Sequence, residues 1–183
     1  MSSEKGSSRP QPVRHQIDTN TVVIETIGSV GVIRFNRPDR RNALHDDMYP
    51  PSIEAVRSFA VDPSIGCVVV TGEGSAFNSG GDIRGGTGRR PDGPPPTFDE
   101  RVANLVRISE FAVALHESPI PTIAAVNGPA AGAGMAIALS CDMRIMSSNA
   151  RLVPAFVKLA FSGDFGMSWF LNRLVGHSRA LED

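Results

Sequence analysis

The residues most suited to chemistry lie in two short stretches rich in glycine and alanine, about fifty positions apart. The first reads AFNSGGDIRGG, from Ala76 to Gly86, and the second reads AVNGPAAGAGMAIALSCD, from Ala125 to Asp142. Because small side chains let the main chain approach a ligand closely, two such turns can direct two backbone N–H groups at one substrate atom. The pair is consistent with the two halves of an oxyanion hole.

Two other chemistries of glycine turns are excluded by residue type. A phosphate-binding P-loop requires a lysine after its last glycine, and neither stretch has one. A dinucleotide-binding turn requires three spaced glycines, but GAGMAI from Gly132 supplies only two, and Leu152 stands where an acidic residue is needed. An oxyanion hole requires only two N–H groups at the ends of separate strands, ideally one of them at a helix N-terminus.

Asp164 is the carboxylate most suited to proton transfer. It lies in LAFSGDFGMSWFL beside Phe161, Phe165 and Met167, where desolvation would raise its pKa toward that of a general base. The alternative is that Asp164 caps the helix that follows it. Asp82 directly follows the first glycine turn, so a role in capping or fixing the loop is favoured over a role as a base.

The remaining reactive side chains predict structural roles. Cys67 and Cys141 each lie in an apolar run without a second cysteine or histidine nearby, so two buried, reduced thiols and no metal site are expected. Tyr49 is expected to pack within a helix rather than to line a ligand pocket. Surface positions are expected for the four histidines, His15, His45, His116 and His177.

Strands, glycine turns and helices alternate along the chain, which predicts an α/β fold of repeated strand–strand–helix units. A hairpin around Gly28-Ser29 is expected between Val22 and Phe35. Helices are expected from about Ser52 to Ala60, in FDERVANLVRISEFAVALHESP and in AGAGMAIALSC, and strands in IGCVVVTG, TIAAVNG and MRIMSS. The block GGTGRRPDGPPPTFDE is expected to form a mobile loop. In the long helix one buried face is expected, formed by Val102, Leu105, Val106, Ile108, Phe111, Ala112 and Leu115.

Composition is that of a protein with one sizeable core. The chain has 183 residues, 41% of them hydrophobic and 20% charged, and a net charge of −1, so no attraction to nucleic acid or to an anionic membrane is expected. The N-terminus lacks the apolar region of a signal peptide, which predicts a disordered tail over residues 1–17, a core domain over 18–183 and a cytoplasmic location.

One uncharged segment, from Ile120 to Cys141, is long enough to cross a bilayer. It contains two prolines and several glycines, and most of its other residues are alanines, so its transfer into lipid would be weak. We expect it inside the protein, with no membrane span.

The two glycine stretches resemble the paired signatures of the enoyl-CoA hydratase/isomerase family, the crotonase superfamily. TGEGSAFNSGGDI is similar to the first signature and PTIAAVNGPAAGAGMAIALSCDMRI to the second. RFNRPDRRNAL looks like the coenzyme A segment and FLNRLVGHSRALE like a later helix, so the resemblance runs from about Val22 to the last residue. It implies a crotonase-like (ClpP/crotonase) spiral of repeated ββα units, lacking its C-terminal helical region.

The resemblance implies roles for particular residues. The backbone N–H groups of Gly81 and Ala133 would hold the thioester oxygen.

The resemblance also implies contacts with coenzyme A. Arg40 and Arg41 would bind its phosphates and Ala43 would border its adenine, although a solvated charged turn is an equal alternative for the arginines. Further substrate or coenzyme A contacts are expected at Ser79, Asp82 and Ile83. Coenzyme A is part of the substrate, so no separate cofactor is expected.

The sequence departs from the family where hydratases carry two glutamates. Those positions fall at Ala136 and Phe156, which cannot move a proton. Asp164 lies where some family members with isomerase or dehalogenase chemistry carry a catalytic aspartate. One base can remove and return a proton between carbons, whereas hydration benefits from an acid and a base, so hydration is in doubt.

Two hypotheses follow from the resemblance. The first is an acyl-CoA enzyme, labelled an enoyl-CoA hydratase or isomerase, with Asp164 as acid or base. The second is an inactive, truncated acyl-CoA binder, because the family continues beyond this end in helices that cover the pocket and join subunits. A full-length chain would be expected as a homotrimer or hexamer.

Overall fold

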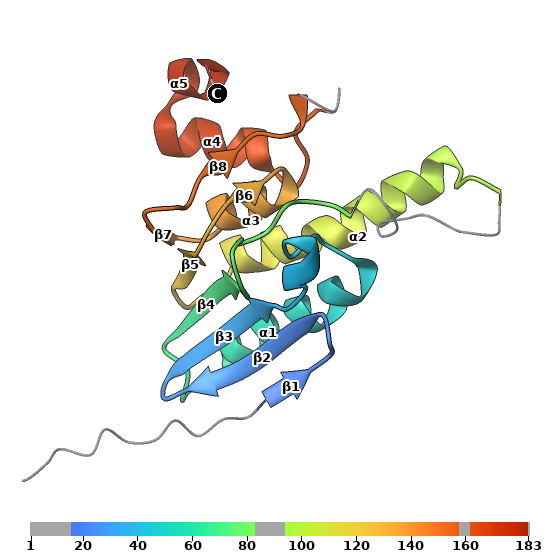
Figure 1. The fold of residues 1–183 in the computed structure, drawn as a ribbon. Helices are drawn as coiled ribbons and strands as arrows, with labels where there is room; N and C mark the ends of the chain where they lie inside the picture. The colour runs from blue at the N-terminus through green and yellow to red at the C-terminus, as the bar shows by residue number, and fades with distance from the viewer. Residues whose placement is uncertain (1–15, 83–93, 158–161, 183) are drawn as a thin grey trace, which may run out of the picture.

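The computed structural model describes residues 16–82, 94–157 and 162–182, and its main feature is a six-stranded sheet. The strand order is β1 (Gln16–Asp18), β2 (Val22–Ile27), β3 (Val30–Phe35), β4 (Cys67–Gly72), β5 (Thr122–Val126) and β7 (Met143–Met146). β1, β2 and β3 pair antiparallel, whereas the pairs from β3 to β7 are parallel (Figure 1). The carboxyl ends of the parallel strands therefore meet at one edge.

The predicted hairpin is confirmed, since Ile27 pairs with Val30 across the turn. β1 begins at Gln16, inside the range in which a disordered tail is expected, and it pairs with β2. Its three residues form a strand because β2 offers an open edge. Amino-acid composition alone does not predict such a pairing.

A second layer of short pairings completes the strand–strand–helix units. β6 (Ala130–Ala131) and β8 (Leu152–Val153) form a two-stranded parallel sheet, and single bridges join Leu44 to Gly81 and Asn78 to Ala130. Thus β5, β6 and the next helix form one unit, and β7, β8 and their helix form another. The predicted repeat is confirmed, although β6 and β8 are too short for a periodicity to predict.

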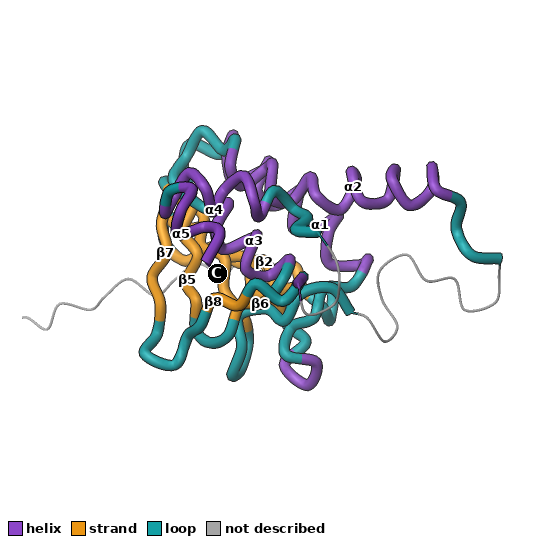
Figure 2. The backbone as a smooth tube through the Cα atoms, turned by 90° about the horizontal axis from the view of Figure 1, so that it is seen from above, coloured by secondary structure: helices purple, strands orange, loops and turns teal. Residues whose placement is uncertain are grey.

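The helices gather on one side of the large sheet (Figure 2). They are α1 (Tyr49–Val61), α2 (Phe98–His116), α3 (Ala133–Ser140), α4 (Met167–Val175) and α5 (His177–Glu182), with 3-10 turns at Pro38–Arg40 and Asp46–Met48. α1 begins three residues before the expected Ser52, because Pro50 and Pro51 fit its first turn, where no backbone N–H is needed. A capping box between Thr97 and Glu100 begins α2.

The long helix α2 buries less than its periodicity predicts. Ile108, Phe111, Ala112 and Leu115 are buried, as expected. The expected face is wrong for the first half of the helix, because Val102, Leu105 and Val106 are 45%, 42% and 63% exposed. That half runs out beyond the sheet, where no described element covers it (Figure 1).

The segment from 120 to 141 is largely buried within the fold, as expected. It forms β5, a turn, β6 and α3, and every residue of α3 is buried. Within the described ranges no helix has the length and apolar character needed to cross a membrane.

Cys141 is buried, but Cys67 is only half-buried. The expectation of two buried thiols is therefore wrong for Cys67, which faces the more open side of β4.

Candidate active site

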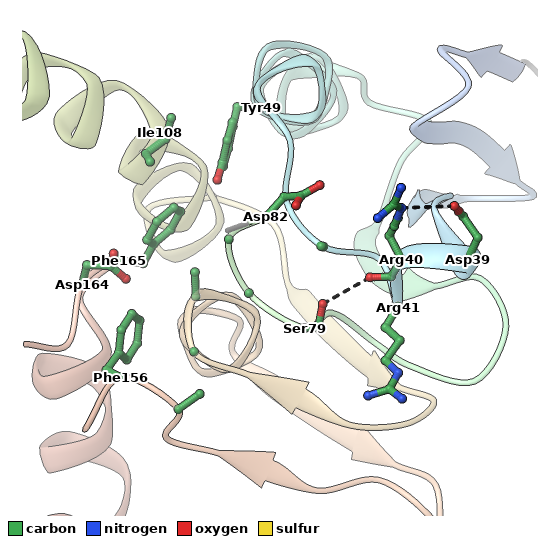
Figure 3. Close-up of a pocket in the computed structure, with 16 residues that line it drawn as sticks. Asp39, Arg40, Arg41, Tyr49, Ser79, Asp82, Ile108, Phe156, Asp164 and Phe165 are labelled. Carbon is green, nitrogen blue, oxygen red and sulfur yellow. Dashed lines mark hydrogen bonds and ion pairs between the residues drawn. The ribbon is translucent and has the colours of Figure 1, made fainter. Parts of the chain in front are cut away.

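Both glycine turns border one cavity of about 650 Å³ at the carboxyl ends of the parallel strands. Its mouth is polar, with Asp39, Arg40 and Arg41, and its other end is largely apolar, with Tyr49, Ile108, Phe156 and Phe165 around Asp164 (Figure 3). Gly81 and Ala133 lie among the residues that line it. The cavity thus brings together the two turns, the two arginines and the aspartate that the sequence singles out.

The first turn is held against the segment that follows β3. The N–H of Leu44 donates to the oxygen of Gly80 at 2.8 Å, and the N–H of Asp82 donates to the oxygen of Leu44 at 3.0 Å. The N–H of Ser79 donates to the oxygen of Arg41 at 3.1 Å. Three main-chain bonds therefore fix the turn beside the arginines of the cavity mouth.

The side chain of Arg37 reinforces the same junction. Its guanidinium donates to Oδ2 of Asp82 at 2.9 Å and to the carbonyl of Ala43 at 2.6 Å. The side chains of the ion pair are only 17% and 11% exposed. Asp82 therefore fixes the loop, which is the role favoured for it from the sequence, and a contact with substrate stays a prediction.

The two glycine turns touch each other. The N–H of Ala131 donates to the oxygen of Asn78 at 2.9 Å, and the N–H of Phe77 donates to the oxygen of Pro129 at 3.1 Å. A Cβ atom added at Gly80 would lie 3.6 Å from the nitrogen of Ala133 and 3.0 Å from the oxygen of Ala131. The turns therefore approach as closely as the absence of a side chain at Gly80 allows.

Two N–H groups in these turns remain available. No hydrogen-bond partner for the N–H of Gly81 or of Ala133 occurs within the described ranges. Ala133 is the first residue of α3, where backbone N–H groups have no partner inside the helix and the helix dipole is positive. Both residues line the cavity, so an anionic or carbonyl oxygen has two candidate donors there.

Asp164 lies in the apolar end of the cavity. Its Oδ1 is buried and has no hydrogen-bond partner among the described residues. Burial raises the pKa of Asp164 to about 6, and a hydrogen bond from its own backbone partly offsets that rise. Figure 3 shows the carboxylate beside the rings of Phe156 and Phe165.

Asp164 does not cap the helix that follows it. The N-cap residue of α4 is Gly166, and no side chain makes a cap hydrogen bond there. Phe165 adopts a left-handed φ of 51°, which is unusual for a bulky residue and marks a turn held by its surroundings. The Asp164 side chain lines the cavity and makes no cap hydrogen bond to the helix.

The two positions at which hydratases of the family carry glutamate are apolar in space as well as in sequence. Ala136 is fully buried in α3, and Phe156 is 7% exposed and lines the cavity. Asp39 and Asp82, the other carboxylates among the lining residues, pair with Arg40 and Arg37 respectively. Asp164 is therefore the one carboxylate at the apolar end of the described cavity.

The predicted coenzyme A residues lie together at the mouth. Arg40 pairs with Asp39 at 3.6 Å in an exposed contact, and Arg41 has a left-handed φ of 51°. The N–H and the carbonyl of Ala43 both have intramolecular partners, Arg40 and Arg37. The hydroxyl of Ser79 donates to the oxygen of Arg40 at 3.3 Å. Ile83 lies outside the described residues.

Several residues of the candidate site were not expected there from the sequence. Arg37 and Asn78 organise the first turn, and Tyr49, expected to pack within a helix, is buried and also lines the cavity. His116 is exposed, as expected, yet its ring packs 5.1 Å from that of Trp169. The described residues contain no group of His, Cys, Asp or Glu that could hold a metal ion.

A mainly parallel sheet that delivers two backbone turns to one cavity defines an α/β protein with a candidate site for a carbonyl oxygen. Residues 25–182 match the family model described as enoyl-CoA hydratase/isomerase. The chain belongs to the enoyl-CoA hydratase/isomerase family, and its fold is crotonase-like.

Three similar proteins illustrate the range of the family. The 4-chlorobenzoyl coenzyme A dehalogenase-1 of Arthrobacter sp is 33% identical over 163 residues, which cover 88% of this chain and 57% of the relative. The 1,2-epoxyphenylacetyl-CoA isomerase of Escherichia coli K12 is 38% identical over 152 residues, 83% of this chain and 57% of the relative. A Thermobifida fusca YX structure in complex with acetoacetyl-CoA, assigned as an enoyl-CoA hydratase, has a TM-score of 0.76 at 34% identity, with 89% of this chain and 65% of the other covered. The chain thus spans somewhat more than half the length of the relatives it matches.

Proposed function

We propose that this chain acts on an acyl-CoA thioester and moves a proton between two carbons of the acyl group. The N–H groups of Gly81 and Ala133 hold the thioester oxygen, and Asp164 is the base. The observation that carries the proposal is the buried Oδ1 of Asp164, which has no partner among the described residues, in a cavity that Gly81 and Ala133 both line. Membership of an acyl-CoA family, and a neighbour that binds acetoacetyl-CoA, support the class of substrate.

The reaction that fits one base is the conversion of a 3-enoyl-CoA to a 2-enoyl-CoA. The Asp164 carboxylate removes a proton from the carbon next to the thioester, and the electron pair moves onto the oxygen held by the two N–H groups. The protonated carboxyl then returns the proton to the carbon two bonds further along. No atom is gained or lost, and each backbone donor can contribute about a hundredfold to a thousandfold in rate.

Hydration and halide displacement are the alternatives that use the same site. Hydration is disfavoured because Ala136 and Phe156 replace the two carboxylates that would handle water. Two observations support the second alternative, displacement of chloride from a chloroaryl-CoA thioester. They are the aromatic walls around Asp164 and the similarity to a 4-chlorobenzoyl-CoA dehalogenase. There the carboxylate would attack the ring carbon, chloride would leave, and water would cleave the resulting ester.

The mouth of the cavity suits the other end of the substrate. Arg40 and Arg41 supply positive charge for the phosphates of coenzyme A, and Ala43, Ser79 and Asp82 line the same cavity. A further contact at Ile83, outside the described residues, is proposed from the family resemblance alone. By the family relationship we also propose a homotrimer or hexamer in the cytoplasm and no cofactor besides the substrate's own coenzyme A.

Three assays on one protein preparation separate these functions. Incubation with 3-hexenoyl-CoA should increase the absorbance of the conjugated thioester, crotonyl-CoA would lose that absorbance on hydration, and 4-chlorobenzoyl-CoA would release chloride. We expect the first assay to be positive and Asp164→Asn to lose at least about a hundredfold in rate. Asp39→Asn, a lining carboxylate at the far end, is the matched control. Binding of coenzyme A without turnover in any assay would favour a non-catalytic binder.

A further inference from the structure

Asn78 lies where the two glycine turns meet. It is fully buried, and its backbone pairs with Ala130 in a parallel bridge of the second layer. Its main-chain oxygen accepts from the N–H of Ala131 at 2.9 Å. The residue thus belongs to the first turn by sequence and is bonded to the second turn by its main chain.

The side chain of Asn78 selects which amide of the first turn is used internally. Its Oδ1 accepts a hydrogen bond from the N–H of Gly80 at 2.8 Å. This bond occupies the Gly80 N–H inside the protein, and the next N–H, that of Gly81, is the one left without a described partner. A side chain that accepts from the residue two positions ahead imposes a defined local turn.

The second turn is shaped to accept this side chain. A Cβ atom added at Gly134 would lie 2.5 Å from the main-chain oxygen of Asn78 and 2.6 Å from its Oδ1. Gly134 is the second residue of α3, so the first turn of that helix packs directly on the Asn78 amide. The position of Ala133, one residue earlier, is therefore set by the same contact.

The contact leaves one polar group unsatisfied. Nδ2 of Asn78 is buried and has no hydrogen-bond partner among the described residues. A buried unpaired donor costs about 1–3 kcal/mol, so stability alone does not account for an asparagine here. A serine would accept from Gly80 without that unpaired amide.

We propose that the side chain of Asn78 is a positioning group, which aligns the N–H groups of Gly81 and Ala133 on one substrate oxygen through its hydrogen bond to Gly80 and its packing against Gly134 at the start of α3. This inference rests on the proposed function. Asn78 touches no substrate in this scheme. It acts through Gly80 in the first turn and through the start of α3 in the second.

The test compares two variants of similar side-chain size. Asn78→Ala removes the acceptor for the Gly80 N–H, and Asn78→Ser supplies a hydroxyl oxygen as a new acceptor. We expect Asn78→Ala to lower kcat about tenfold to a hundredfold, less than or equal to the loss of one oxyanion donor, with KM changed less than about threefold. Asn78→Ser should retain activity within about threefold of the parent. An equal decrease of kcat in both variants, or an increase of KM without a decrease of kcat, would overturn the proposal.

Two further measurements separate this proposal from the proposed function. Infrared spectroscopy of bound crotonyl-CoA labelled with ¹³C at the thioester carbonyl should show a lowered stretching frequency in the parent and in Asn78→Ser, and a partial return toward the free value in Asn78→Ala. No lowering in the parent would defeat the oxyanion hole itself. Amide exchange of Gly80 needs no substrate and should be faster in Asn78→Ala only; unchanged exchange would defeat the positioning role alone.

Discussion

Arg37 donates to the Asp82 carboxylate at 2.9 Å, with 17% and 11% of the two side chains exposed, and so joins the segment after β3 to the first glycine turn. The same guanidinium donates to the carbonyl of Ala43. Residues 45 positions apart in sequence therefore set the position of the loop that supplies the proposed Gly81 donor.

Replacement of Arg37 by methionine should destabilise the protein by about 2–3 kcal/mol, because a largely buried carboxylate loses its partner. The matched control is Arg57→Met, whose ion pair with Glu110 is 60% and 47% exposed and should contribute less than about 1 kcal/mol. Urea unfolding of both variants measures the difference. Similar losses in the two proteins would show that the Arg37 pair is no more than a surface contact.

The rate of isomerisation should depend on the ionisation of Asp164. Since burial raises the pKa of Asp164 to about 6 and the base must be ionised to accept a proton, kcat/KM for 3-hexenoyl-CoA should rise as the pH rises through about 6. A pH–rate profile between pH 5 and 8 at constant ionic strength is the measurement. A profile that is flat across that interval would remove Asp164 as the base.

Asp164 should lower the stability of the folded protein at neutral pH. Its folded pKa of about 6 lies above the ordinary aspartate value of 3.8, so the folded state holds the proton more tightly and the free energy of unfolding falls as the pH rises between these values. Asp164→Asn should therefore be more stable than the parent at pH 7.5, by about 1 kcal/mol after solvent screening, and the gain should shrink toward pH 5.

Asp62 provides a control of opposite sign for the stability measurement. Hydrogen bonds from Ser64 lower the pKa of Asp62, so its ionised form favours the folded state above its ordinary pKa. Asp62→Asn should lose stability at pH 7.5, and the loss should shrink in acid. If both variants shifted in the same direction, burial would not be the cause of the Asp164 effect.

The arginines at the cavity mouth should contribute to coenzyme A affinity and not to the chemical step. Arg41→Ala should weaken binding of coenzyme A about twofold to fivefold, with kcat unchanged, because an exposed charge pair contributes at most about 1 kcal/mol. Calorimetric titration at low and high salt measures it, and the difference should shrink at high salt. Arg151→Ala, outside the lining residues, should bind like the parent; if it weakens binding equally, net charge alone accounts for the effect.

The two thiols should differ in reactivity. Burial raises the pKa of the Cys141 thiol to about 12, whereas Cys67 is half-buried on β4. Ellman's reagent at pH 8 should therefore label at most one thiol of the native protein, and Cys67→Ser should abolish the labelling. Two reactive thiols before unfolding would show that α3 opens readily around Cys141.

Local patterns were sufficient to predict most of the sheet and its helices. The valines of β4, the small residues of α3 and the glycine between β2 and β3 each indicate their element from a few neighbouring residues. β6, β8 and the single bridges could not be predicted, because two-residue pairings have no periodicity and depend on what lies beside them. The exposure of Val102 and Val106 was missed for the same reason, since periodicity does not reveal where the sheet ends.

Sequence by itself determined the kinds of group present: small residues that expose main-chain amides, apolar residues in place of the two glutamates, and one carboxylate among aromatic rings. Tertiary structure decided which of them meet. It paired Asp82 with Arg37, left Oδ1 of Asp164 without a described partner, and placed Asn78 between the turns. The physical reason is that burial and hydrogen bonding depend on segments brought together across the sheet. Local conformation, in contrast, depends mainly on residues within a few positions of the chain.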